Sequence, residues 1–139
     1  MIVPAPRGVK GQEHNRAIHT PNAPAAIGPY SQAVISGNTV FVSGQLGVDP
    51  HTGMFVEGGV REQTARAIDN IAAVLEAAGT NLEHVVSCTV FLADMNDFPA
   101  MNEVYGNRFR EPYPARATIQ AARLPKNALV EISCIAVLP

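Results

Sequence analysis

Two charged side chains lie in a part of the chain where apolar residues would be expected to build a core. Arg116 and Glu131 each stand near the start of a strand-like run, and Thr118 follows on the same strand face as Arg116. Burying either charge without a partner costs several kcal/mol. A guanidinium also grips a planar carboxylate through two parallel hydrogen bonds. The pair therefore indicates either a structural salt bridge within a hairpin or a binding site for a small acid.

Other polar residues that could serve such a site lie beside glycines and aromatic residues. Tyr30 follows a glycine–proline turn, and Asn102 lies one helical turn after Phe98. Ser43 and Gly44 end a strand-like run, where glycine lets backbone N–H groups approach a ligand closely. Each residue also has an ordinary structural interpretation, as a core phenol, a strand hydroxyl or a helix-surface amide.

The sequence lacks the usual metal and cofactor motifs. The histidines do not form an HExxH or similar ligand spacing; they are His14, His19, His51 and His84. No GxGxxG follows a strand, and neither a P-loop nor a GxSxG elbow occurs. We therefore expect neither a metal nor a cofactor.

Composition predicts one compact domain. The chain has 139 residues, of which 47% are apolar and 16% charged, and a net charge of −2 that counts against a nucleic-acid partner. No apolar run is long enough for a bilayer, so we expect no membrane partner and a cytoplasmic protein. Residues 1–20 read as a flexible tail before a domain at 21–139, with organelle targeting as the alternative interpretation. Cys88 and Cys134 are expected to be buried, reduced thiols.

Local patterns predict the first elements. A glycine–asparagine turn at 37–38 predicts a hairpin over 33–45. Apolar residues at three- and four-residue steps predict a helix over 60–78, which Gly79 ends. A run rich in β-branched residues predicts a strand over 84–95.

Patterns in the second half of the chain predict one more helix and two more strands. Asn96 and Asp97 can cap a second helix, whose apolar stripe is Phe98, Met101, Tyr105 and Phe109. Two closing strands are expected at 115–123 and 129–138. The fold class is therefore α+β, a mixed sheet with both helices on one face. Packing of the other face in a homo-oligomer would bury it.

Four sequence blocks, in this order, strongly resemble the Rid family of reactive-intermediate deaminases. They are APAAIGPYSQA, VSGQLGVDP, NDFPAMNEVY and PARATIQAARLPKNALVEISCIAV. The resemblance implies a chorismate-mutase-like fold and a homotrimer with a barrel-like centre, with ligand sites between subunits. It implies hydrolysis of 2-imino and enamine acids of the 2-aminoacrylate type to 2-keto acids and ammonia, which removes reactive metabolites.

The resemblance also implies roles for individual residues. Arg116 matches the arginine of the deaminase subgroup and would hold the substrate carboxylate. Glu131 would position or activate water, while Tyr30 and Asn102 would supply orienting hydrogen bonds. The remaining matched binding positions are Ser43, Gly44, Phe98 and Thr118. Thr118 stands where many members have cysteine, so a thiol nucleophile is absent there.

Two other activities compete with the deaminase interpretation. RNA cleavage or translational inhibition is also attached to the family, although the acidic balance of this chain counts against RNA binding. The other alternative is a trimer that binds small carboxylates without turnover or acts like a chaperone.

Overall fold

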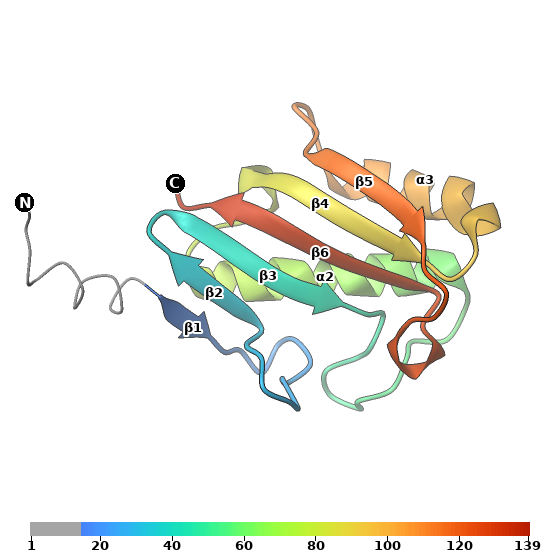
Figure 1. Ribbon diagram of the computed structural model, residues 1–139, viewed down its shortest axis with the longest axis horizontal. Helices are drawn as coiled ribbons and strands as arrows, with labels where there is room; N and C mark the ends of the chain where they lie inside the picture. The colour runs from blue at the N-terminus through green and yellow to red at the C-terminus, as the bar shows by residue number, and fades with distance from the viewer. Residues whose placement is uncertain (1–14) are drawn as a thin grey trace, which may run out of the picture.

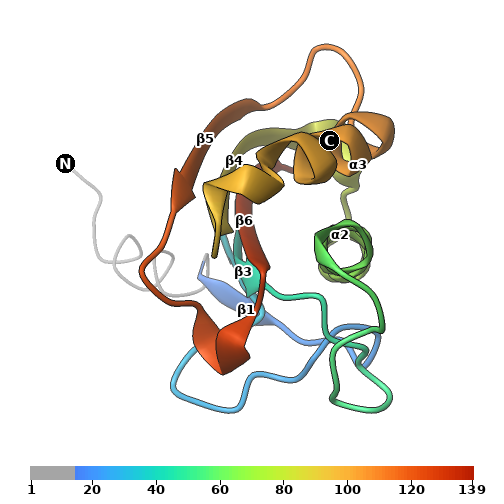
Figure 2. The same ribbon diagram turned by 90° about the vertical axis from the view of Figure 1, so that its right-hand side faces the viewer.

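The structure, a computed structural model, describes residues 15–139. Six strands form one mixed sheet in the order β1-β2-β3-β6-β4-β5. Both long helices lie on the same side of this sheet (Figures 1 and 2). The predicted α+β class with two helices on one face of a mixed sheet is confirmed.

The first half of the sheet is an antiparallel meander. β1 (Arg16–Ile18) pairs with β2 (Ala33–Ser36), which turns into β3 (Thr39–Gln45). Gly37 has a φ of +60°, a conformation that glycine adopts without steric cost, so the predicted turn is confirmed.

Helix α2 (Val60–Ala78) has the bounds that its apolar stripe predicts. At its start, the carboxylate of Glu62 accepts a hydrogen bond of 2.8 Å from the Gly59 backbone N–H. This bond lowers the pKa of Glu62. Gly79 ends the helix in the left-handed conformation, with φ of +92°. The stripe packs on β3 and β6.

The second half of the molecule contains three further strands and one helix. β4 (Val85–Leu92) leads to α3 (Phe98–Arg108), which returns the chain to β5 (Ala115–Gln120). β6 (Val130–Val137) is antiparallel to both of its neighbours, β3 and β4. Short 3₁₀ turns precede β4, α3 and β6; they are η1 (Leu82–His84), η2 (Met95–Asp97) and η3 (Pro125–Asn127).

The expected hairpin of the two closing strands is wrong. β5 runs parallel to β4 at the edge of the sheet, and β4 separates it from β6. Each strand takes the place that suits its composition. β6 is almost continuously apolar and lies in the interior of the sheet, whereas β5 carries Arg116 and Gln120 and stays exposed at the edge.

The N-terminal boundary also differs from the expectation. Part of the expected tail, Arg16–Ile18, pairs with β2 as a strand. Its three residues are too few to show an alternating pattern, which is why the sequence did not predict a strand there. Residues 1–14, the rest of the expected tail, lie outside the described residues.

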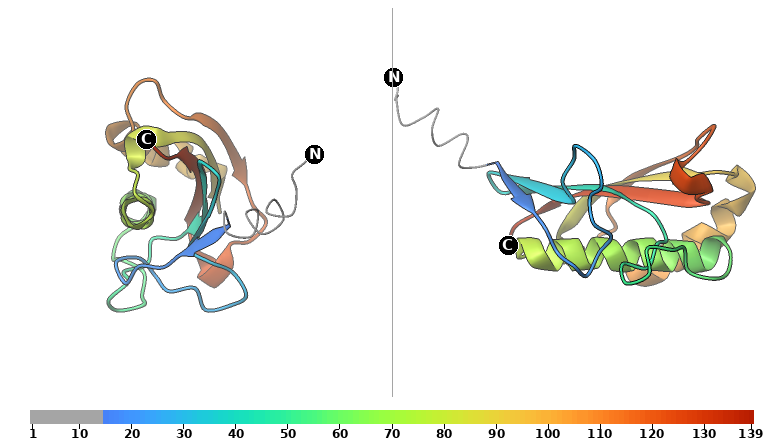
Figure 3. Two further views of the ribbon diagram at one scale, coloured as in Figure 1. Left: turned by 90° about the vertical axis from the view of Figure 1, so that its left-hand side faces the viewer. Right: turned by 90° about the horizontal axis from the view of Figure 1, so that it is seen from below.

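The two faces of the sheet have different surroundings. Val130, Ile132 and Cys134 of β6 are buried toward the helices, whereas the residues between them point to the opposite face. Figure 3 shows the sheet edge-on with both helices on one side. On the opposite face, Phe41 is 47% exposed and Ile119 is 48% exposed. Among the described residues, no helix has the length and hydropathy to cross a membrane.

Candidate functional site

Four of the predicted site residues line one cavity of about 700 Å³, which we call the Glu131 cavity. They are Tyr30, Ser43, Gly44 and Glu131, and we call them the Glu131 group. They come from the loop before β2, the end of β3 and the start of β6. The structure therefore brings together residues that are about 100 positions apart in the sequence.

A β-bulge gives the Glu131 group its geometry. Val42 pairs with Cys134 and Gln45 pairs with Ile132, so two residues of β3 stand opposite Ser133 alone. These two residues are Ser43 and Gly44. The carboxylate of Glu131 lies directly against Gly44, where a Cβ atom would collide with it. The missing side chain at Gly44 is therefore what allows Glu131 to occupy this place.

A buried glutamine fixes the loop that carries Tyr30. Gln32 is 2% exposed and its amide nitrogen donates to the carbonyls of Thr20, Ala23 and Pro24 at 3.0, 3.2 and 2.8 Å. Its amide oxygen accepts from the Thr20 N–H at 2.7 Å. These bonds satisfy loop backbone groups that would otherwise be unpaired. This role was not predicted, because a single polar residue before a strand has no distinctive spacing.

Two further hydrogen bonds join this loop to the bulge. The Ser43 hydroxyl donates to the Ser31 carbonyl at 2.6 Å, and the Ser43 backbone N–H donates to the Gln32 carbonyl at 3.0 Å. Ser43 thus connects the loop to β3, and its hydroxyl proton is already in use. The hydroxyl oxygen of Ser43 keeps its capacity to accept a hydrogen bond.

The surroundings of Glu131 change the acidity of its carboxyl group. It is half-buried, and this burial raises the pKa of its carboxyl above the ordinary value of 4.5. A carboxylate with a raised pKa is a better base near neutral pH than a solvated one.

Arg116 lies on the other face of the sheet, against α3. Its Cζ atom is 4.6 Å from the ring centroid of Tyr105 and 5.5 Å from that of Phe98. Asn102 is four residues after Phe98 and three before Tyr105, so the three residues share one side of the helix. Burial raises the pKa of Tyr105, which keeps this phenol neutral beside the guanidinium.

Thr118 lies two residues after Arg116 on β5 and pairs with Val90 of β4. Its side-chain oxygen is buried and has no hydrogen-bond partner among the described residues. We call Phe98, Asn102, Arg116 and Thr118 the Arg116 group.

The salt-bridge interpretation of Arg116 and Glu131 is wrong within one chain. Arg116 stands opposite Cys88 of β4, and Glu131 stands opposite Phe91 on the other edge of the same strand. Two strand spacings and three residues separate them by roughly 14 Å. Their side chains also point to opposite faces of the sheet. Within residues 15–139, neither side chain takes part in an ion pair.

The two ion pairs that the described residues form hold the helices together. Arg61 pairs with Glu103, and Arg108 pairs with Asp69 at 2.7 Å, so each joins α2 to α3. They join α2 to the helix whose Phe98 and Tyr105 rings lie against Arg116.

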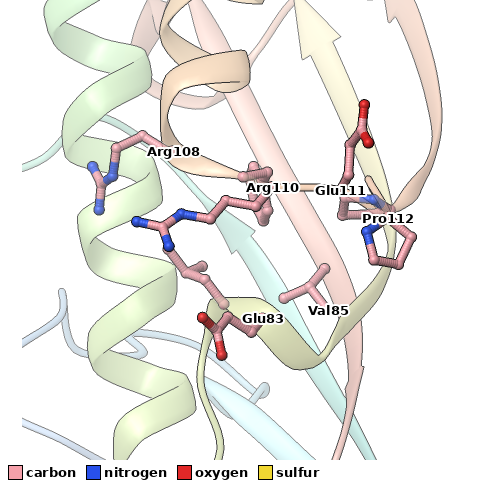
Figure 4. Close-up of a pocket in the computed structure, with 9 residues that line it drawn as sticks. Glu83, Val85, Arg108, Arg110, Glu111 and Pro112 are labelled. Atoms are coloured by element: carbon pink, nitrogen blue, oxygen red, sulfur yellow. The ribbon is translucent and has the colours of Figure 1, made fainter.

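A second cavity, of about 420 Å³, lies beside the C-terminal end of α3 and η1 (Figure 4). Charged residues at this cavity include Glu83, Arg108, Arg110 and Glu111. None of the predicted site residues lines it, so it is separate from the Glu131 cavity.

The remaining candidates for chemistry are cysteines and metal ligands. Cys88 and Cys134 are both buried and free, as predicted, and burial raises the pKa of each thiol. Such thiols are poor nucleophiles. In residues 15–139, no three His, Cys, Asp or Glu side chains are grouped so that they could hold a metal ion.

Comparison with known sequences finds close relatives. The family model described as endoribonuclease L-PSP matches residues 20–138. A 2-iminobutanoate/2-iminopropanoate deaminase from Capra hircus is 54% identical over 122 residues, which cover 88% of this chain and 89% of the relative.

Solved structures share the fold. RidA from the Antarctic bacterium Psychrobacter has a TM-score of 0.85 and 50% identity, covering 88% of this chain and 99% of that one. TdcF from E. coli, solved with bound serine, has a TM-score of 0.83 and 41% identity, covering 89% of this chain and 99% of that one.

Proposed function

We propose that this chain, which belongs to the Rid family, is a 2-iminobutanoate/2-iminopropanoate deaminase. The endoribonuclease L-PSP model, which matches this chain, describes that family. The substrate is a small 2-imino acid, and the products are a 2-keto acid and ammonia. The observation that carries the proposal is the division of the site. Arg116, which has no acid partner within residues 15–139, and Glu131, a carboxylate with a raised pKa, lie on opposite faces of the sheet.

This division implies that two copies of the chain complete one site. The Arg116 group of one copy meets the Glu131 group of its neighbour, in a homotrimer with three such sites. The exposed apolar side chains on the outer sheet face, Phe41 and Ile119 among them, favour such packing. The large cavity beside Glu131 leaves room for residues of a neighbour as well as for a ligand.

Arg116 holds the substrate carboxylate. Its planar guanidinium makes two parallel hydrogen bonds to the carboxylate, and the rings of Phe98 and Tyr105 support it from α3. This grip fixes the imine carbon relative to Glu131. The serine bound in the related TdcF structure is itself a small amino acid with a carboxylate.

Glu131 accepts and donates the protons that move during hydrolysis. Water adds to the carbon of the protonated imine while Glu131 accepts one of the water protons, which gives a neutral tetrahedral carbinolamine. Glu131 then passes that proton to the nitrogen. The C–N bond breaks and ammonia leaves, while the remaining hydroxyl proton moves to Glu131 and the C=O bond forms. Tyr30, Asn102 and the backbone N–H of Gly44 orient the water and the imine. Because the imine carbon is already electrophilic, this sequence needs no covalent nucleophile.

A coupled assay tests the proposal. A dehydratase generates 2-aminoacrylate from serine, and the rate of ammonia release is measured with and without the protein. Arg116→Ala should lower kcat/KM by about 100-fold or more, because a bidentate grip on a carboxylate is lost. Arg116→Lys should recover only part of this loss, because lysine keeps the charge but not the fork.

Arg110→Ala is the matched control. It removes an arginine from the separate cavity and should leave the rate unchanged. Equal rates for wild type and Arg116→Ala would refute the mechanism. A wild-type protein that binds 2-keto acids without accelerating ammonia release would be a carboxylate-binding protein instead.

A further inference from the structure

The turn before β6 has an unusual backbone. Lys126 and Asn127 are consecutive residues with φ of +58°, the left-handed region that residues other than glycine rarely adopt. They are the only non-glycine residues with positive φ in the part of the chain that the structure describes. Such strain persists only where the surrounding structure enforces it, and it concentrates at functional sites.

The surroundings of this turn do enforce it. The N–H of Asn127 donates to the Leu124 carbonyl at 3.1 Å, and the N–H of Ala128 donates to the Pro125 carbonyl at 3.0 Å. The next N–H, of Leu129, donates to the side-chain oxygen of Gln63 on α2 at 3.0 Å. The turn is therefore tied to the main helix.

The strained turn places Lys126 in the wall of the Glu131 cavity. Among the residues that line this cavity, Lys126 is the only lysine or arginine and Glu131 is the only aspartate or glutamate. Neither of the ion pairs found in residues 15–139 involves Lys126. Its ammonium group is thus not neutralised by an acid of the described chain.

A cation is useful at this place. An imino acid is an anion, and the ionised Glu131 carboxylate repels it as it enters the cavity. A positive charge in the same wall offsets this repulsion and attracts the substrate carboxylate.

We propose that Lys126 is a further substrate-binding residue, which draws the anionic imino acid into the Glu131 cavity and contacts its carboxylate. This proposal rests on the proposed function. Arg116 and Lys126 have different roles in substrate binding. Lysine is a flexible point charge that attracts an anion from many directions, whereas the arginine fork fixes one orientation.

Charge variants at Lys126 give the first test. Lys126→Gln should raise KM about 3- to 10-fold at low ionic strength while kcat changes little, because the lost attraction acts on binding. Lys126→Glu should raise KM further, and Lys126→Arg should restore it. The difference between wild type and Lys126→Gln should shrink as salt is added, because salt screens exposed charges. An unchanged KM for Lys126→Gln at low salt would overturn the proposal.

A matched pair of glycine variants separates the charge from the backbone. Lys126→Gly and Asn127→Gly each relieve one left-handed residue of the same turn. Both should unfold at the same or a higher denaturant concentration than wild type, but only Lys126→Gly should raise KM. Equal KM values for the two variants would show that the turn acts through its shape, which would overturn the role of the ammonium group.

A binding measurement keeps this proposal separate from the deaminase assignment. The Kd of 2-ketobutyrate, a stable 2-keto acid, is measured by titration calorimetry for wild type and Lys126→Gln. A higher Kd for the variant supports the role of Lys126 even if the wild type shows no turnover. Equal Kd values in an active deaminase would overturn the role of Lys126 alone.

Discussion

At the scale of single residues, the position of Glu131 depends on an atom that is absent. Gly44 has no Cβ, and the Glu131 carboxylate fills that space. Gly44 does not adopt the left-handed backbone conformation. The four glycines with positive φ among the described residues lie elsewhere in the chain. The requirement for glycine is therefore steric and local to the site.

Gly44→Ala should reduce activity without unfolding the protein. The new methyl group would push the end of a flexible side chain, which can move at little cost in stability. A displaced base is costly for catalysis, so we expect kcat/KM to fall about 10- to 100-fold. The free energy of unfolding should stay within about 1 kcal/mol of wild type. Kinetics and urea unfolding on the same preparation check both values, and full activity of the variant would contradict this view of Glu131.

The pH dependence of the reaction should report Glu131. Glu131 accepts a proton only when ionised, so kcat/KM falls as the pH drops through its pKa. Burial raises this pKa, and the acid limb should therefore lie above pH 4.5. The raised pKa also means that the ionised carboxylate destabilises the folded state at neutral pH.

Glu131→Gln should therefore be at least as stable as wild type at pH 7, and this advantage should disappear as the pH falls below the ordinary pKa of a glutamate. Its kcat should fall by about 100-fold or more, because the base is lost. An acid limb at or below pH 4.5 in the wild type would show that another group controls the rate.

At the scale of elements, close packing on α2 holds the loop that follows β3. A Cβ on Gly47 would lie 2.5 Å from the Cα atom of Gln63, and helix backbone cannot yield as a side chain can. The same Gln63 accepts the hydrogen bond from Leu129 at the start of β6. This helix therefore connects the two segments that line the Glu131 cavity.

Gly47→Ala and Gly106→Ala form a matched pair. Gly47→Ala should lower the free energy of unfolding by about 1–3 kcal/mol, because it overpacks a rigid contact. Gly106 lies in α3 with nothing near its missing Cβ, so Gly106→Ala should raise the free energy of unfolding by about 0.5–1 kcal/mol. Urea denaturation measures both. A neutral Gly47→Ala would show that the loop moves away from the helix easily.

Elements set by local signals could be predicted from the sequence, and those set by long-range pairing could not. The bounds of α2 follow from an apolar stripe and a terminal glycine, which are both local. The separation of β5 from β6 depends on which strand takes the interior of the sheet. Nothing in the short connection between them encodes that choice.

For the site residues too, local signals were readable from the sequence and long-range placement was not. Motifs in the sequence identified residues of both groups, but their placement on opposite faces needed the strand register. Gln32 and Lys126 were missed because a single polar residue at a strand start or in a turn has no distinctive spacing. Their roles became visible through burial and backbone conformation.

At the scale of the whole molecule, one chain keeps the two groups of the proposed site apart. The sheet separates Arg116 from Glu131, and the outer face of the sheet leaves apolar side chains exposed. Association of copies would resolve both features at once, because it buries the face and brings the two groups together. With the proposed mechanism, activity is therefore a property of the assembly.

Mixed oligomers test this central claim most directly. Arg116→Ala chains and Glu131→Gln chains are unfolded together in equal amounts, refolded, and assayed for ammonia release from 2-aminoacrylate. Each variant refolded alone should be nearly inactive. In the mixture, about a quarter of the sites should combine an intact Arg116 group with an intact Glu131 group, so activity should return to about a quarter of wild type. A mixture as inactive as its two components would contradict a site shared between subunits.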